Sequence, residues 1–249
     1  MAKIIGDDPL LKKIKGFSHY KMQGVKERIL REASGFTKET IKDSRYRRCG
    51  ENATEFGAVT SLCKKFRDPL DGVFAVSGRR DLSNRVTSKM RSLMELDTLS
   101  PQGTRNLDVA FSFEQTRQKM VGYDFNLAAP LPYRSRSFIV LERGGGVRLD
   151  VRSFVSELHF PDGCESVAVL MHHYLFDFNC GKGVLTSSTP LFLNRFTSLK
   201  NAYLSCVFPA SNEGILFTLL ELKFYGFEGG CYVHMVPDWG TMVHVLQCG

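Results

Sequence analysis

The histidines and cysteines are the side chains of this chain best suited to acid–base, nucleophilic or metal chemistry. His172 and His173 are adjacent in a segment, 166–178, whose apolar composition predicts a strand. Neighbouring strand residues point to opposite faces, so the two imidazoles cannot easily share one metal ion. Either both are hydrogen-bonded structural histidines, which is the simpler interpretation, or one is a ligand or base. Cys231 and His234 are three residues apart on a predicted strand, and opposite faces argue against a Cys–His dyad.

Other patterns associated with catalysis or metal binding are incomplete. His159 and Asp162 flank a Pro-Asp-Gly turn and could pair, but no nucleophile lies near them in the sequence. The segment 179–183, NCGKG, lacks the G-x-x-x-x-G-K-[ST] spacing of a phosphate loop and precedes no predicted helix. The seven cysteines form no C-x-x-C pair and no zinc-type cluster, which indicates reduced thiols. We therefore predict no catalytic residue, no metal and no cofactor.

Basic side chains dominate the start of the chain. Residues 1–106 contain 22 Lys and Arg against 13 Asp and Glu, whereas residues 107–249 contain 11 against 13. Such a basic lobe indicates an acidic partner, such as nucleic acid, a membrane surface or an acidic protein. The candidate binding residues of this lobe are Lys21, Lys26, Arg28, Arg31, Arg45, Arg47, Arg48, Lys64, Lys65 and Arg67.

The residues around this basic lobe leave two kinds of partner open. Tyr20 and Tyr46 could stack on bases, and phosphate contacts would make nucleic-acid binding steeply salt-dependent. Interleaved glutamates and the lack of a nucleic-acid-reading motif favour instead a docking surface for a protein partner or for neighbouring subunits. Some of the basic residues could simply protect an exposed sheet edge. Trp239, in the turn 237–240, is a further candidate anchor if exposed, or a cap on the sheet end if folded back.

A strand-built body must position these side chains. The segment 214–246 contains long apolar runs broken at 228–230 and at 237–240, which predicts three strands joined as a meander. The spacing of the strands and their turn residues predict a mainly β protein with an antiparallel β-sandwich or jelly-roll-like body. We expect its earlier strands at about 108–113, 122–126, 137–142, 147–151, 166–178, 183–187 and 202–208.

A hairpin and two helices are predicted ahead of this body. The segments 17–22 and 28–32 alternate in polarity and predict a basic β-hairpin. Apolar residues at three- and four-residue spacing predict α-helices over about 52–67 and 81–96. The apolar stripe of the first helix comprises Ala53, Phe56, Val59, Cys63 and Phe66. We therefore expect two domains, a basic hairpin plus helical lobe over 1–106 and the antiparallel sandwich over 107–249.

One stretch near the start of the chain resembles a known group of sequences. Residues 18–44 (SHYKMQGVKERILREASGFTKETIKDS) and 51–57 (ENATEFG) are similar to the N-terminal part of uncharacterised Bacteroidetes proteins, in which YKMxG…ILR precedes TKExIK and REN…EFG. More distantly, the layout resembles a family of unknown function from the same phylum, with some prophage-related members. The segment 47–52 departs from the R-x-R-E-N pattern, which puts the alignment there in doubt. The resemblance implies a bacterial source, no known activity and no catalytic residue.

Composition completes these expectations. The 249 residues, 43% of them hydrophobic and 24% charged, suit a globular protein with a sizeable core. No apolar run approaches the roughly 20 residues of a membrane span, and residues 1–16 lack a signal-type apolar segment. We expect a cytoplasmic protein or part of a virion-like assembly. Its predicted function is that of a non-enzymatic structural or interaction protein, a subunit of a phage-like or other multi-subunit assembly; the alternative is nucleic-acid binding by the same basic lobe.

Overall fold

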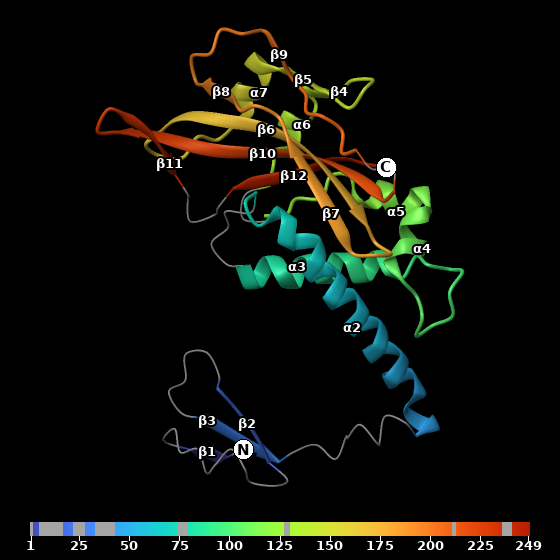
Figure 1. Cartoon of the computed structure of the whole chain (residues 1–249). Helices are drawn as coiled ribbons and strands as arrows, with labels where there is room; N and C mark the ends of the chain where they lie inside the picture. The colour runs from blue at the N-terminus through green and yellow to red at the C-terminus, as the bar shows by residue number, and fades with distance from the viewer. Residues whose placement is uncertain are drawn as a thin grey trace. The chain divides into compact units, whose positions relative to one another are not determined.

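The computed structural model of the chain describes residues 2–4, 17–21, 28–32, 43–73, 79–126, 130–210, 213–235 and 241–249 (Figure 1). Two compact units are distinguished, Met1–Glu51 and Asn52–Gly249, and each is described by itself. The domain boundary expected at residue 106 does not coincide with this division, because the helices before it share a core with the sheet that follows.

The first unit contains the predicted hairpin. Strands β2 and β3 pair antiparallel, with Phe17 opposite Glu32 and Lys21 opposite Arg28, and β1 adds a third strand along the other edge of β3. The Asp43 carboxylate accepts a hydrogen bond from the Arg45 backbone N–H and caps a short 3-10 helix, η2. The bounds are β1 Ala2–Ile4, β2 Phe17–Lys21, β3 Arg28–Glu32 and η2 Ser44–Tyr46.

Both predicted long helices are confirmed. Helix α2 spans Arg47–Arg67, starting earlier than expected, and α3 spans Arg79–Met94. Pro69 follows α2 and lies in a short 3-10 helix, η3 (Asp68–Leu70), because proline lacks the N–H that would continue the α-helical ladder. The predicted apolar stripe of α2 is partly wrong: Ala53 is exposed and Phe56 is 48% exposed, whereas Glu55 is buried.

The segment predicted as a strand over 108–113 is instead helix α4, Leu107–Ser112. Its buried residues Leu107, Ala110 and Phe111 follow helical spacing. The Asn106 side chain accepts a hydrogen bond from the Val109 N–H and begins the helix. Three further short helices were not predicted, namely α5 (Glu114–Met120), α6 (Tyr133–Arg136) and α7 (Val151–Glu157).

Two fourteen-residue strands form the centre of the larger sheet. They are β6 (Cys164–Asp177) and β10 (Ile215–Glu228), which pair antiparallel along almost their whole length. Each carries two short strands in series along its outer edge. Strands β7 (Lys182–Ser187) and β8 (Leu191–Asn194) pair with β6, and β11 (Cys231–Met235) and β12 (Met242–Cys248) pair with β10.

The predicted C-terminal meander is therefore wrong in one respect. Strand β12 pairs with β10 rather than with β11, so the two strands occupy successive halves of the same edge. The tight turn between β10 and β11 is as expected: Gly229 and Gly230 both have positive φ, 57° and 87°, which a two-residue hairpin of type I′ requires. The segment 122–126, expected as a strand, is an isolated bridge between Asp124 and His244 instead. Its Gly122 and Phe125 N–H groups donate hydrogen bonds to the Val245 and Val243 carbonyls of β12.

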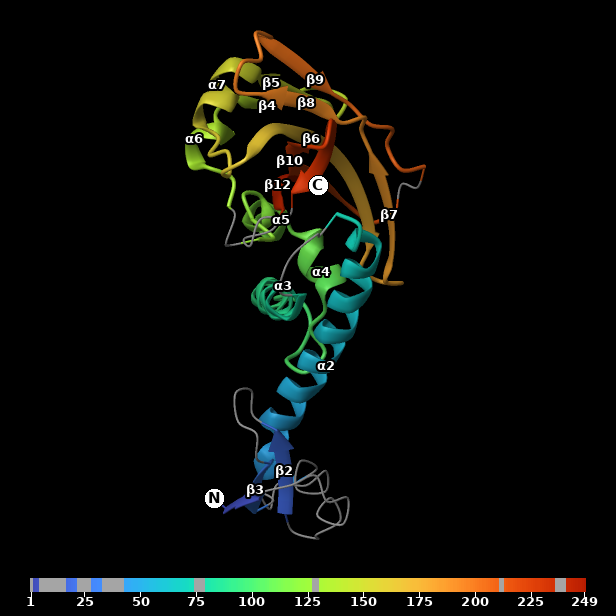
Figure 2. The same ribbon diagram turned by 90° about the vertical axis from the view of Figure 1, so that its left-hand side faces the viewer.

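The mainly β, antiparallel body is confirmed, with a substantial helical part. One face of the larger sheet packs against α2, α3 and α4, and we call it the helix face; its core includes Phe66, Tyr174, Phe176 and Phe217. The opposite face packs on α7 and on a second, three-stranded sheet, as Figure 2 shows from the side. That sheet consists of β4 (Ile139–Leu141), β5 (Val147–Asp150) and β9 (Asn201–Leu204) in the order β4-β5-β9.

Candidate functional site

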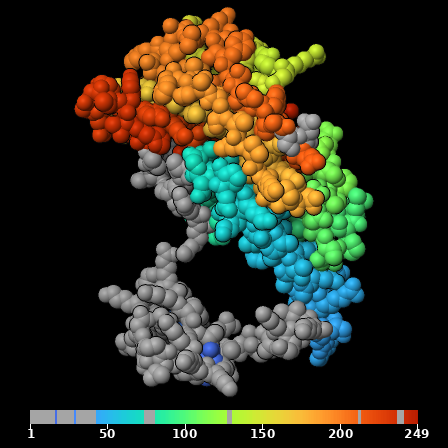
Figure 3. Space-filling model, in the orientation of Figure 1, coloured from blue at the N-terminus to red at the C-terminus, as the bar shows by residue number. Residues whose placement is uncertain are grey.

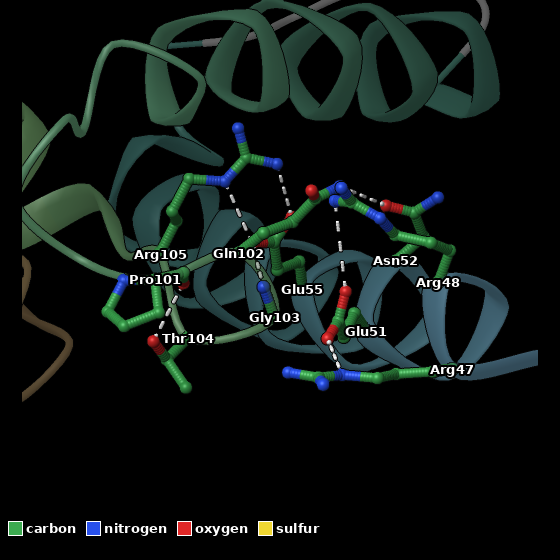
Figure 4. Close-up of polar contacts among 10 residues, drawn as sticks. All are labelled: Arg47, Arg48, Glu51, Asn52, Glu55, Pro101, Gln102, Gly103, Thr104 and Arg105. Atoms are coloured by element: carbon green, nitrogen blue, oxygen red, sulfur yellow. Dashed lines mark hydrogen bonds and ion pairs between the residues drawn. The ribbon is translucent and has the colours of Figure 1, made fainter. Parts of the chain in front are cut away.

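The arginines at the start of α2 lie close to acidic side chains of the same segment. Arg45 pairs with Asp43 at 2.7 Å. Arg47 and Arg48 reach Glu51 at 2.7 Å and 4.0 Å (Figure 4). The three arginine side chains are 72–81% exposed. Exposed pairs of this kind contribute only about 0–1 kcal/mol, so a partner could displace the acids. Two carboxylates nevertheless offset most of the positive charge that the sequence analysis assigned to this segment.

The basic residues at the end of α2 have different surroundings. Lys64 and Lys65 are exposed, and the Lys65 side chain lies over Gly181 in the turn between β6 and β7. The Arg67 Nε donates a hydrogen bond to the Cys63 carbonyl at 3.1 Å. All three suit the negative end of the helix dipole. A helix of 21 residues is about 30 Å long, so these residues and the arginines at its start do not form one patch.

The other predicted binding residues cannot be placed as side chains. Lys21, Arg28 and Arg31 lie in β2 and β3, and their side chains are outside the description. Lys26 and Trp239 lie outside the described residues. Their roles stay predictions.

His172 belongs to a buried polar network on the helix face of the sheet. Its Nε2 lies 3.0 Å from Glu221 Oε2, and its Nδ1 lies 2.8 Å from the Ser187 hydroxyl. Lys223 Nζ lies 3.1 Å from the same Glu221 oxygen. Glu221 is fully buried and His172 is 3% exposed. The network therefore joins β7, β6 and β10 through side chains that the sequence had given no reason to group.

The chemistry of this network follows from what each group can donate. A carboxylate only accepts, so the Nε2 that binds Glu221 must carry a proton. In the neutral ring the His172 Nδ1 is then an acceptor for the Ser187 hydroxyl, which gives the order hydroxyl, imidazole, carboxylate. Ser187 is exposed while the imidazole behind it is not. The arrangement gives Glu221 Oε2 two partners, His172 and Lys223, and links side chains of three strands, while Glu221 Oε1 has no hydrogen-bond partner among the described residues.

His173 points to the opposite face, as predicted from strand alternation. Its Nδ1 lies 3.3 Å from the Thr218 hydroxyl, and its ring stacks on Phe208 with centroids 4.5 Å apart. Burial lowers the pKa of His173 below the ordinary value of 6.5, because the site disfavours the charged ring. The two adjacent histidines therefore do not share a ligand.

Two further buried ion pairs hold loops against the body. Glu55, on α2, accepts two hydrogen bonds from Arg105 at 2.9 Å and 2.7 Å and one from the Gly103 N–H at 2.6 Å (Figure 4). The bond from Arg105 holds the pKa of Glu55 below its ordinary value. Asp124 binds His244 at 2.6 Å and Arg136 at 2.8 Å. The buried carboxylates of Glu55 and Asp124 thus have partners within the fold, and a structural role accounts for their burial.

An exposed band of aromatic rings crosses the end of the larger sheet that carries β8 and β11. We call the rings Phe192, Tyr225, Phe227, Tyr232 and His234 the aromatic band. Phe192 contacts Tyr225 at 5.6 Å between centroids, Tyr225 contacts His234 at 5.3 Å, and Phe227 contacts Tyr232 at 5.3 Å. Phe192, Phe227 and Tyr232 are 56%, 49% and 59% exposed.

Small residues of β6 allow two rings of the aromatic band, Phe192 and Tyr225, to meet. Phe192 lies opposite Ala168 and Tyr225 lies opposite Ser166, so β6 separates the two rings in the sheet. Because Ala168 and Ser166 are short, the rings meet above them. The period-two placing of Tyr225 and Phe227 could have indicated part of this band from the sequence. Phe192 could not have been included, because β8 was not predicted.

In the space-filling view, the β10–β11 hairpin (red) forms one projecting end of the second unit (Figure 3). Strand β11 contains no charged residue and no proline, and among the described strands it pairs only with β10. Such an edge offers unpaired backbone N–H and C=O groups, which proteins usually protect with lysine, proline or a bulge.

No group of three or more metal-binding side chains is found within the described part of the chain. None of the helices described is both long and apolar enough to cross a membrane. No protein-family model, no curated protein and no solved structure matches the chain. The resemblance to Bacteroidetes proteins therefore stays a prediction.

Proposed function

We propose that this protein is a structural or interaction protein, a self-assembling subunit that docks through the aromatic band and the free edge of β11. The observation that carries the proposal is the exposure of Phe227 and Tyr232 on the β10–β11 hairpin, whose outer strand has no charged residue. Phe192, on β8, is exposed as well. Aromatic residues are enriched at protein interfaces, whereas lysine and glutamate are depleted there. The ring contacts within the band hold the side chains in place, which lowers the entropy cost of docking.

The partner we assign to this edge is a second copy of the chain. In an antiparallel pair of two β11 strands centred on Val233, Tyr232 of each copy lies opposite His234 of the other. Tyr232 and His234 share a face with Phe227 and Tyr225, their neighbours on β10, so the band would continue from one copy to the next. Because β11 carries no charge, the two copies meet without repulsion.

The setting we propose for such a subunit is a phage-like or other multi-subunit assembly. It is suggested by the distant resemblance of the chain's layout to a family with some prophage-related members. The part of the basic lobe that lies in the first unit would supply a second docking surface. Its exposed arginines, Arg45, Arg47 and Arg48, form weak surface pairs that an acidic partner could replace.

Light scattering on a size-exclusion column tests self-assembly. We expect the wild type to elute with twice the mass of the chain or more, rising with concentration. Val233→Lys and Val233→Glu each place like charges opposite one another at the centre of the pair, and each should be monomeric. Mixing the two variants should restore the assembled form. Val184→Lys on β7 is the matched control, because Val184 is 49% and Val233 is 43% exposed. A wild type that is monomeric at every concentration would refute the proposal.

Nucleic-acid binding by the basic lobe is the other outcome to test. Retention on heparin and binding of labelled single- and double-stranded nucleic acid would be measured from low to moderate salt. Phosphate binding predicts a steep loss of affinity with salt and weaker binding after Arg45, Arg47 and Arg48 are changed to Gln. No binding at low salt would end this alternative.

A further inference from the structure

A hollow of about 590 Å³ opens beside α7. It is lined by residues from both ends of α7, by the segment that follows α7 and by the loop after β8. The residues that carry the argument are Arg152, Val155, Leu158, Phe160, Asp162 and Arg195. The volume is within the roughly 300–1,000 Å³ of pockets that hold small molecules.

Two arginines face this hollow without a counter-ion. Arg152 and Arg195 form no ion pair with any residue that the structure describes, unlike Arg105, Arg136 and Arg148 elsewhere in the unit. Asp162 is the single acid among the described lining residues. The hollow therefore has an excess of positive charge, and the guanidinium groups have unused donors that match a phosphate or carboxylate.

Arg195 is held in position by its neighbours. Its guanidinium carbon lies 5.2 Å from the centroid of the Phe160 ring, and Phe160 is 7% exposed. The loop that carries Arg195 is closed by Asn194, whose side chain accepts hydrogen bonds from the Phe196 N–H at 2.9 Å and the Thr197 hydroxyl at 3.1 Å. A cation fixed in this way loses little entropy when an anion binds.

We infer that this hollow binds a small phosphate monoester that carries a flat ring. Arg152 and Arg195 would hold the phosphate through paired hydrogen bonds. The apolar lining, Val155, Leu158 and Phe160, suits the ring, since small-molecule sites combine an apolar wall with a few polar anchors. The site does not involve β11, so it stands or falls independently of self-assembly.

The test separates the phosphate from the ring. Isothermal titration at low ionic strength would compare inorganic phosphate, phenyl phosphate, adenosine 5′-monophosphate and adenosine. We expect both esters to bind, inorganic phosphate to bind more weakly, and adenosine not to bind. Adenosine binding as tightly as its monophosphate would overturn the inference, and so would the failure of both esters to bind at millimolar concentration.

Variants of the two arginines identify the site. Arg152→Gln and Arg195→Gln should each weaken ester binding about tenfold or more, the loss expected for hydrogen bonds to a charged group. Arg195→Lys keeps the charge but loses the fork, so it should bind less tightly than wild type and more tightly than Arg195→Gln. Arg134→Gln is the control, because Arg134 is exposed on α6 and does not line the hollow. Equal affinity of wild type, Arg152→Gln and Arg195→Gln would place the ligand elsewhere. Circular dichroism would confirm that each variant is folded.

Discussion

Replacing Phe66 by alanine should destabilise the second unit far more than replacing Phe56, although both belong to the apolar stripe that the sequence predicts for α2. Phe66 is 1% exposed, and its ring centroid lies 5.1 Å from Tyr174 and Phe176 and 5.3 Å from Phe217. A buried Phe→Ala change removes these contacts and leaves a cavity, at a cost of about 3–5 kcal/mol. In a chain of this size that corresponds to a fall in Tm of roughly 6–20 °C.

Phe56 provides the internal comparison. Its side chain is 48% exposed, and its ring lies 5.8 Å from the guanidinium carbon of Arg91. An exposed cation–π contact contributes about 0.5–1 kcal/mol, so Phe56→Ala should cost no more than about 1 kcal/mol. Urea denaturation followed by circular dichroism, at one protein concentration for all variants, measures both changes.

The outcome that would refute this reasoning is an equal loss for both variants, or a larger one for Phe56→Ala. Either result would mean that α2 presents a different face to the sheet. If Phe66→Ala does not fold, Phe66→Leu retains part of the ring volume and should show a smaller loss in the same direction.

Two pH-dependent predictions follow from buried titratable groups. Glu55→Gln should cost about 2–4 kcal/mol near neutral pH, because it leaves Arg105 largely buried without its counter-ion. Arg105 lowers the pKa of folded Glu55. The stability difference between wild type and Glu55→Gln is therefore fully present above the ordinary pKa of 4.5 and disappears as the pH falls through the lowered pKa. A stability difference that stays constant down to about pH 2 would contradict this reasoning. The pKa of His173 is also lowered, by burial, so the unfolded chain binds a proton first as the pH falls below 6.5 and stability drops there. His173→Phe should remove that part of the slope, measured by thermal unfolding between pH 5 and 8; an unchanged slope would assign it to another group.

The local pattern of apolar residues was sufficient to predict those helices and strands in which the buried residues recur with a single period. The hairpin of β2 and β3, the helices α2 and α3 and the long strands β6 and β10 were all predicted, because the core covers one stripe or face of each. The pattern failed for α4, because a short apolar run fits the two-residue period of a strand as well as the 3.6-residue period of a helix. The Asn106 side chain caps the segment and favours the helix. The pattern also predicted that Phe56 is buried in the core. Periodicity identifies the apolar face of a helix, but it does not indicate how far along the helix the core extends.

The sequence by itself determined the charge asymmetry, the antiparallel strand-rich body and the opposite faces of His172 and His173, since these depend on composition and on alternation along one strand. Only the tertiary structure decided which strand β12 pairs with, that Glu221 lies beside His172, that Phe192 meets Tyr225 across β6, and that Arg152 and Arg195 face one hollow. Each of these joins residues far apart in the chain. Such contacts are selected by the packing of the whole core, and no local period contains that information.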